Sequence, residues 1–266
     1  MLPPWHPHYE VWLLVFVLVY GYWYADRRLR PVIAPGAPQA TKAQRWQWYA
    51  AVLALWLVSG WPIHDLGETS LFTVHMVEHM VIALVIPPLL LRGLPRWLAD
   101  ATLGRVARWI RPLARPVPAF VLFNATFVVI HWPELVGWML TNGAVHFSVH
   151  TWLFAVSLLM WMPIFSPTRS IPRLAPPGQM LYLFLQSLLP TIPASFLTFS
   201  SVAIYPVYGD AALAFGLTAV ADQTIAGVVM KLGGGFLLWG TIAVIWFRWT
   251  RDERDWERLE SSLRSS

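Results

Sequence analysis

Two pairs of histidines have the spacing of a metal-binding or cofactor-binding site. They lie in the segments His75-Met-Val-Glu-His79 and His146-Phe-Ser-Val-His150. Residues four apart on a helix share one face, so each pair presents two imidazoles one turn apart. Imidazole suits copper and zinc, and the thioether of methionine favours Cu(I). One such pair is weak evidence, but two pairs at matching depth on different helices predict a shared site.

The remaining ligand types narrow the chemistry. The chain has no cysteine, which excludes disulfides and thiolate metal sites. A metal must therefore be held by histidine, methionine, carboxylate or backbone groups. Met230 is expected at a similar depth to the histidine pairs and is a candidate ligand. Met76 and Met80 each neighbour a histidine, so they point along a somewhat different face and are expected around the site.

Further polar residues are expected in the same layer. His131 ends an apolar segment and is a candidate ligand, whereas His6 and His8 are interpreted as interfacial residues. His64 precedes Asp65, and the two are predicted to form an outer gate in which the carboxylate orients the imidazole.

Two charged residues stand out near the last apolar segment. Asp222 is by default the N-cap of its own helix, and alternatively belongs to the rim of the site. Apart from Arg248 at the end of the last apolar segment, Lys231 is the one Lys or Arg inside any such segment, and such residues are usually functional or paired. Glu78 or Asp65 is the expected partner of Lys231.

The composition indicates what must position these residues. The 266-residue chain is 57% hydrophobic and 12% charged, whereas soluble domains are about a quarter charged. The apolar runs are long and continuous rather than alternating, which predicts membrane-spanning helices and not a barrel. The net charge of +5 comes from residues in short loops, so the expected partner is a lipid bilayer and not a nucleic acid.

Seven apolar segments are long enough to cross a membrane. The predicted fold is an all-α polytopic helix bundle, with a seven-span domain over residues 1–250 and a charged cytoplasmic tail over 251–266. The first segment has no Lys or Arg before it and is expected to be retained rather than cleaved. The predicted spans are Tyr9–Ala25, Trp46–Pro62, Leu71–Leu91, Pro118–Trp132, Val145–Phe165, Gln179–Ser200 and Ala226–Trp249.

The basic residues predict the orientation of these spans. Arginines and lysines follow the first, third, fifth and seventh spans. The N-terminal segment and the loops His64–Ser70, Pro133–Ala144 and Tyr205–Asp222 contain none. The positive-inside rule therefore predicts an outer N-terminus and a cytoplasmic C-terminus. All eight histidines are then expected at the outer ends of the helices.

Three other functions compete with a copper site. The string from His75 to His79 also matches H-x-x-E-H, an inverted zinc-protease motif, but no distal glutamate ligand is evident. A membrane protein with bis-histidine haem ligation between the third and fifth spans is the leading alternative. A metal transporter needs polar groups along its whole path, and the inner halves of the spans lack them.

Several motifs together resemble one family. They are Leu71–Met80 followed by Pro87-Pro88-Leu-Leu-Leu-Arg-Gly-Leu-Pro95, His131-Trp132, His146-x-x-x-His150 leading to Trp161-x-Pro163, and Asp222-Gln223-x-x-Ala226-Gly227-x-x-Met230. From about Trp61 to Gly235 the chain resembles the multi-span CtaG-like cytochrome c oxidase assembly proteins. This type is distinct from the single-span copper chaperone that shares the name.

The resemblance implies a non-enzymatic copper-binding assembly factor in the bacterial inner membrane, with Cu(I) as the expected ion. The implied partners are the catalytic subunit of a haem–copper oxidase or another copper chaperone, and a homo-oligomer is compatible with it. Two residues depart from the family pattern, which has glutamine at Glu78 and an apolar or aromatic residue at Lys231. A carboxylate strengthens cation binding and a lysine opposes it, which puts Met230 in question as a ligand. The positions that match the family are His75, His79, His131, His146, His150, Asp222 and Met230.

Overall fold

The computed structural model describes residues 2–209 and 211–265, and over these ranges it is built from helices without strands. Asp210, in the predicted loop Tyr205–Asp222, and Ser266, in the predicted tail, lie outside the described residues, as does Met1. The elements in chain order are α1 (Tyr9–Tyr24), η1 (Ala25–Leu29), α2 (Arg30–Ile33), α3 (Lys42–Val58), α4 (Ile63–Thr69), α5 (Phe72–Met80), η2 (Val81–Val85), α6 (Ile86–Gly93), α7 (Arg96–Leu113), α8 (Pro116–Ile130), α9 (Pro133–Thr141), α10 (Gly143–Phe165), α11 (Pro176–Leu188), α12 (Thr191–Phe199), η3 (Pro206–Tyr208), η4 (Ala211–Phe215) and α13 (Ala219–Ser265).

The predicted all-helical fold is confirmed, and four to six of the helical segments are suited to cross a membrane. The four continuous ones are Phe72–Gly93, Gly143–Phe165, Pro176–Phe199 and Ala219–Arg264. Two bent pairs raise the number to six: α3 with α4, bent by 42°, and Val106–Leu113 with α8, bent by 74°. The helix α1 is not in this set. Its 16 residues rise about 24 Å, less than the roughly 30 Å of a hydrocarbon core.

Three segments expected as loops are helical. The predicted loop His64–Ser70 belongs to α4 as far as Thr69, and Pro133–Ala144 contains α9, which opens on a proline at its first turn. The basic segment after the third span forms α7. The predicted tail is also helical, because α13 continues without a break to Ser265.

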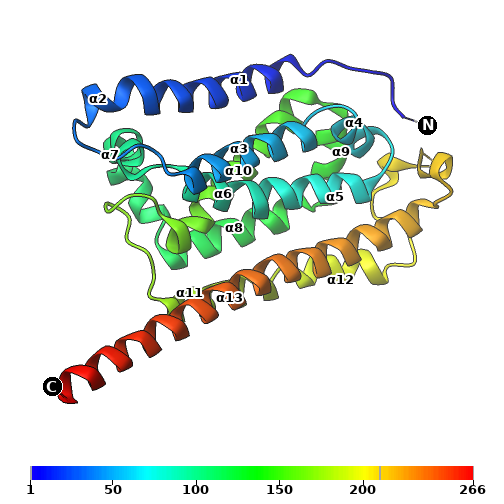
Figure 1. Ribbon diagram of the computed structural model, residues 1–266. Coiled ribbons are helices and arrows are strands. Elements are labelled where there is room, and N and C mark those ends of the chain that lie inside the picture. Colours follow the sequence, from blue (N-terminus) through cyan, green and yellow to red (C-terminus); the bar gives the residue numbers. More distant parts are fainter. Residues whose placement is uncertain (1, 210, 266) are drawn as a thin grey trace.

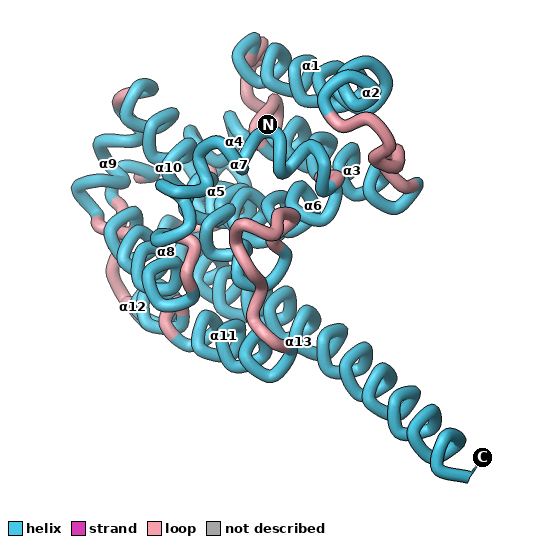
Figure 2. Tube along the Cα trace, turned by 90° about the vertical axis from the view of Figure 1, so that its left-hand side faces the viewer, coloured by secondary structure: helices cyan, strands magenta, loops and turns pink. Residues whose placement is uncertain are grey.

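The bundle has two distinct ends (Figure 1). The N-terminal segment, α4, α9 and the start of α13 lie at one end, and α13 projects beyond the opposite end to the C-terminus. The helix α1 packs on α3 at the edge of the bundle, away from α11 and α12 (Figure 2). The helix α5 contacts both α4 and α13, so it is held between the N-terminal and C-terminal parts of the chain.

A π-helical turn follows the first histidine helix and sets its contact with the second. Proline has no N–H, so Pro87 and Pro88 cannot donate to the preceding turn, and the helix there widens into η2 instead of ending. The indole Nε1 of Trp161 donates to the Ala83 carbonyl in this turn at 3.0 Å. Because Trp161 lies on α10, this buried bond fixes how α10 sits against the helix that carries His75 and His79.

Candidate metal centre

The structure brings the two predicted histidine pairs together. On α5, His75, Glu78 and His79 are buried on one face, because three-residue and four-residue spacings fall on the same side of a helix. On α10, Asn142 accepts from the backbone N–H groups of Ala144 and Val145 and so caps the helix just before His146. The ring centroids within the pairs are 4.2 Å apart for His75 and His79 and 4.1 Å apart for His146 and His150. Between the helices, Nε2 of His79 lies 2.9 Å from Nε2 of His150.

Three of these histidines form a set that can hold a metal ion. One ring nitrogen from each of His75, His146 and His150 lies within 4.8 Å of the others. Nδ1 of His75 and Nε2 of His146 are buried without a hydrogen-bond partner, and so is Oε2 of Glu78. Buried polar atoms are normally paired, and leaving one unpaired costs about 1–3 kcal/mol. Three imidazoles with ligand atoms this close, two of which have an unpaired buried nitrogen, fit a bound cation.

The helix α4 covers this set with a histidine and a second carboxylate. Nδ1 of His64 lies 2.9 Å from Oε1 of Glu78. Glu68 lies 2.7 Å from Nδ1 of His146 and 3.5 Å from Nε2 of His64. The residues His64, Glu68 and His146 form a second potential ligand set, which shares His146 with the first. We call His64, His75, His79, His146 and His150 with Glu68 and Glu78 the histidine cluster.

The predicted gate is wrong in its pairing. The carboxylates that contact His64 are Glu78 and Glu68, whereas Asp65 pairs with Nε2 of His8 at 2.9 Å. Side chains of adjacent residues on a helix do not face each other, so Asp65 does not orient the His64 imidazole. The sequence prediction lacks Glu68 because it assigns this segment to a loop. The sequence signal that could have identified Glu68 is its position four residues after His64, which places the two side chains on one face of a helix.

A glycine allows α4 to approach the cluster closely. A Cβ atom on Gly67 would lie 3.1 Å from both the backbone N and the Cα of His75. The hydroxyl of Tyr208 donates to the Gly67 carbonyl at 2.9 Å. Burial raises the pKa of Tyr208 well above its ordinary value, so the hydroxyl keeps its proton. The position of α4 on α5 is therefore fixed by the contact of Gly67 with the His75 backbone and by the hydrogen bond from Tyr208 to Gly67.

Asp222 acts on α5 rather than on its own helix. Its Oδ2 accepts from the backbone N–H of Phe72 at 2.6 Å, and Oδ1 accepts from that of Thr73 at 3.1 Å. These N–H groups open α5 and have no partner within the helix, and a carboxylate also suits the positive end of the helix dipole. The expectation that Asp222 caps its own helix is therefore wrong. It positions the start of the helix that carries His75.

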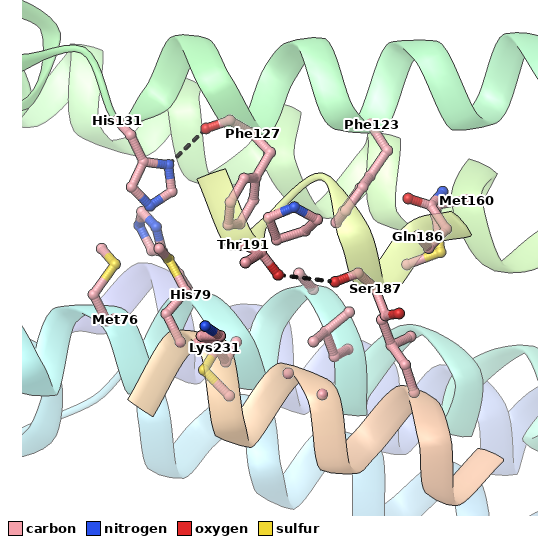
Figure 3. Close-up of a pocket in the computed structure, with 18 of the residues that line it drawn as sticks. Met76, His79, Phe123, Phe127, His131, Met160, Gln186, Ser187, Thr191 and Lys231 are labelled. Atoms are coloured by element: carbon pink, nitrogen blue, oxygen red, sulfur yellow. Dashed lines mark hydrogen bonds between the residues drawn. The ribbon is translucent and has the colours of Figure 1, made fainter. Parts of the chain in front are cut away.

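A second group of predicted residues lines a cavity beside the cluster (Figure 3). The cavity has an empty volume of about 670 Å³, including the part open to the surface. His79 contributes to both regions, since it contacts His150 and also lines the cavity. We call this space the methionine cavity, and its sulfur and polar lining residues include Met76, Met80, Met160, Met230, His79, His131, Gln186 and Lys231.

The cavity, and not the cluster, holds five of the residues predicted as ligands or neighbours of ligands: Met76, Met80, His131, Met230 and Lys231. His131 has Nδ1 2.6 Å from the Phe127 carbonyl, so this nitrogen is the donor and Nε2 is left buried without a partner. Met230 is buried in the wall of the cavity. Lys231 is exposed, and among the described residues it has no ion pair. Its predicted pairing with Glu78 or Asp65 is wrong because both carboxylates face histidines.

One family model and two curated relatives match this chain. The model of the cytochrome c oxidase caa3 assembly factor family matches residues 19–252. Uncharacterized proteins of Mycobacterium bovis and Mycobacterium tuberculosis are each 28% identical over 241 residues, which cover 78% of this chain. The match covers 34% of each relative, so the chain spans about a third of their length. No solved structure matches the chain significantly.

The matched region contains both histidine pairs, α4, Asp222 and the methionine cavity. The family is one of assembly factors and not of catalytic enzymes, in agreement with the prediction of a non-enzymatic role. The chain belongs to the cytochrome c oxidase caa3 assembly factor family.

Proposed function

We propose that this chain binds copper in the histidine cluster at the outer side of the bacterial inner membrane and passes it to a haem–copper cytochrome c oxidase. The observation that supports it most directly is the His75, His146 and His150 set, whose ligand atoms lie within 4.8 Å of one another. Imidazole ligands suit copper, and a site without thiolates holds the ion loosely enough for ligand exchange. The receiving partner is the catalytic subunit or another copper chaperone.

The electrostatics of the cluster support a cationic cargo. Glu78 is fully buried, and Glu68 is partly buried against His146. A buried carboxylate is unfavourable without a compensating positive charge, which a bound copper ion supplies. The described residues of the cluster and of α4 include no Lys or Arg that would compete for these carboxylates.

The adjoining methionine cavity supports Cu(I) as the form of copper that is handled. Thioether sulfur is a soft ligand that favours this ion. The cavity brings Met76, Met80 and Met230 beside His79 and His131. Each of the two histidines has one buried ring nitrogen without a hydrogen-bond partner. An ion released from the cluster would therefore meet soft ligands within the membrane before it reaches the partner.

The topology is proposed with the same function. Seven spans require α1, η1 and α2 to act as one helix from Tyr9 to Ile33, which is about 37 Å long. With an outer N-terminus, the cluster and α4 face the outer side, and the basic segments with α2 and α7 face the cytoplasm. A homo-oligomer stays a prediction.

Haem is the alternative cargo or cofactor for the paired histidines. The contact between Nε2 of His79 and Nε2 of His150 at 2.9 Å favours a small ion, because a flat haem between these rings would have to separate them. One preparation distinguishes the two. We expect copper in the elemental analysis and no Soret band in the visible spectrum, and a Soret band would overturn the copper assignment.

The residue-level test is the double variant His75→Ala/His146→Ala. We expect it to lose bound copper and to lower the copper content and activity of the oxidase assembled in the same cells. The exposed Glu134→Gln variant on α9 serves as a control and should bind copper normally. Unchanged bound copper and oxidase activity in the folded double variant would show that the cluster is not the copper site.

A further inference from the structure

The N-terminal segment carries a third potential ligand set, outside the histidine cluster. One ligand atom from each of His6, His8 and Asp65 lies within 4.8 Å of the others. The segment is held over the outer end of the bundle, since the indole of Trp61 donates to the Pro3 carbonyl at 3.1 Å. The contact between His8 and Asp65 ties it to α4 as well. This arrangement makes His8 a buried residue, and the interpretation of His8 as a simple interfacial histidine is incomplete.

The exposure of this set suits the capture of an ion from solution. The side chain of His6 is exposed, that of Asp65 is partly exposed, and that of His8 is buried between them. Glu10 lies 3.3 Å from Nδ1 of His8 and adds a second carboxylate. No Lys or Arg occurs before residue 27 or between residues 46 and 91, so neither stretch of chain that forms this set brings a competing cation.

The set is continuous with the histidine cluster. The ring centroids of His6 and His8 are 5.0 Å apart, as are those of His8 and His64. The next step, from His64 to His146, is 5.1 Å. His64 and His146 belong to the intermediate set with Glu68, and His146 also belongs to the buried set. Ligands thus follow one another from an exposed residue to a buried site, at spacings that allow one ligand to be exchanged for the next.

We infer that His6, His8 and Asp65 form an entry site that captures a copper ion from the outer solution and delivers it through His64 to the buried set. This inference rests on the proposed function and adds the route by which the cluster is loaded. The ion keeps its charge and oxidation state along the route, and each step exchanges a histidine or carboxylate ligand.

The test follows copper loading of the full chain in detergent micelles, with Cu(I) supplied from its bicinchoninate complex. For His6→Ala/His8→Ala we expect one fewer bound ion and an initial loading rate at least about tenfold lower at limiting copper, as is typical when supporting metal-site residues are removed. The buried site should still fill when copper is in excess. Tyr9→Ala removes an exposed neighbour of His8 and should load at the rate of the wild type.

A second variant separates ligation from folding. Asp65→Asn keeps the size of the side chain and a group that can hydrogen-bond His8, but it removes the negative charge. We expect it to slow loading without changing the thermal stability of the protein. Unchanged rate and stoichiometry in both variants would overturn the entry site.

The outcome for the entry site is distinguishable from that for the proposed function. Loss of copper in His75→Ala/His146→Ala with no effect of the N-terminal variants leaves the buried site as proposed and removes the entry site. An effect of the N-terminal variants with none in His75→Ala/His146→Ala supports capture at the surface and overturns the buried site. A wild-type chain that takes up no copper overturns both.

Discussion

The histidine cluster and the methionine cavity lie on either side of His79, and they offer a cation opposite surroundings. The cluster surrounds imidazoles with the carboxylates Glu68 and Glu78. The described lining of the cavity contains thioethers, two histidines and Lys231, but no carboxylate. A cation is therefore favoured electrostatically in the cluster, whereas only ligand softness favours it in the cavity. Under the proposed function, this difference makes the cluster the resting site of the ion and the cavity the weaker site.

The two regions are also held in place differently. The cluster depends on contacts between distant parts of the chain: Gly67 against His75, Asp222 on the start of α5, and Trp161 on the η2 turn. The cavity is lined mainly by apolar side chains, and Met side chains adapt to irregular space. Substitutions that shift a helix should therefore affect the cluster more than the cavity.

The largest expected difference between the regions is in copper affinity. His146→Ala removes a residue shared by two ligand sets and should lower the Cu(I) affinity about 100-fold. Met230→Leu nearly conserves volume in the cavity and should lower it less than about tenfold. Competition with a chromophoric Cu(I) chelator measures both values. Equal losses in the two variants would show that the cavity is as much a binding site as the cluster.

The close approach of α4 to α5 gives the next effect. Gly67→Ala places a methyl group 3.1 Å from the His75 backbone, so α4 must move. We expect a loss of about 1–3 kcal/mol in the free energy of unfolding and weaker copper binding, since Glu68 moves with α4. Thermal unfolding in detergent and chelator competition measure the two effects.

The matched control for Gly67 is Gly137→Ala on α9. A Cβ atom added there would meet nothing within 4 Å outside its own helix backbone. This variant should be neutral or stabilise by up to about 1 kcal/mol, because alanine favours a helix over glycine. If Gly67→Ala is as stable and binds copper as tightly as Gly137→Ala, the close approach of α4 does not support the cluster.

Removing the Asp222 cap from α5 is expected to lower stability less than Gly67→Ala does. Asp222→Asn removes the charge and one of two acceptor oxygens from the N–H groups of Phe72 and Thr73. The expected loss is about 0.5–2 kcal/mol of stability, the range for helix N-caps. Asp252→Asn, on the exposed part of α13, should have no effect on unfolding. If the two variants unfold alike, Asp222 does not stabilise the start of α5.

The smallest effect concerns the charge beside the cavity. Lys231→Met removes an exposed cation that has no ion pair among the described residues. The variant leaves every candidate ligand in place and removes only a repelling charge, so the Cu(I) affinity should rise. Lys42→Met, at the start of α3, provides the control in the same chelator competition. A lower affinity in Lys231→Met would mean that the lysine assists binding instead of opposing it.

The two histidine pairs are predicted correctly because they depend only on the local periodicity of a helix. The four-residue spacings in α5 and α10 place each pair of imidazoles on one face whatever the rest of the chain does. The length of the apolar runs likewise predicts the spans seen as Phe72–Gly93 and Gly143–Phe165. The short polar helix α4 is not predicted, because it has too few residues to show a period.

The sequence by itself determined the helical class, the absence of thiolate ligands and the two histidine pairs, because each depends on composition or on neighbours within one turn. Only the tertiary structure decided that Glu68 joins the cluster, that Asp222 caps α5 and that Asp65 pairs with His8. Asp65 and His8 are 57 residues apart in the chain, and Asp222 and Phe72 are 150 residues apart. Contacts over such separations depend on how the helices pack, which no local pattern in the sequence encodes.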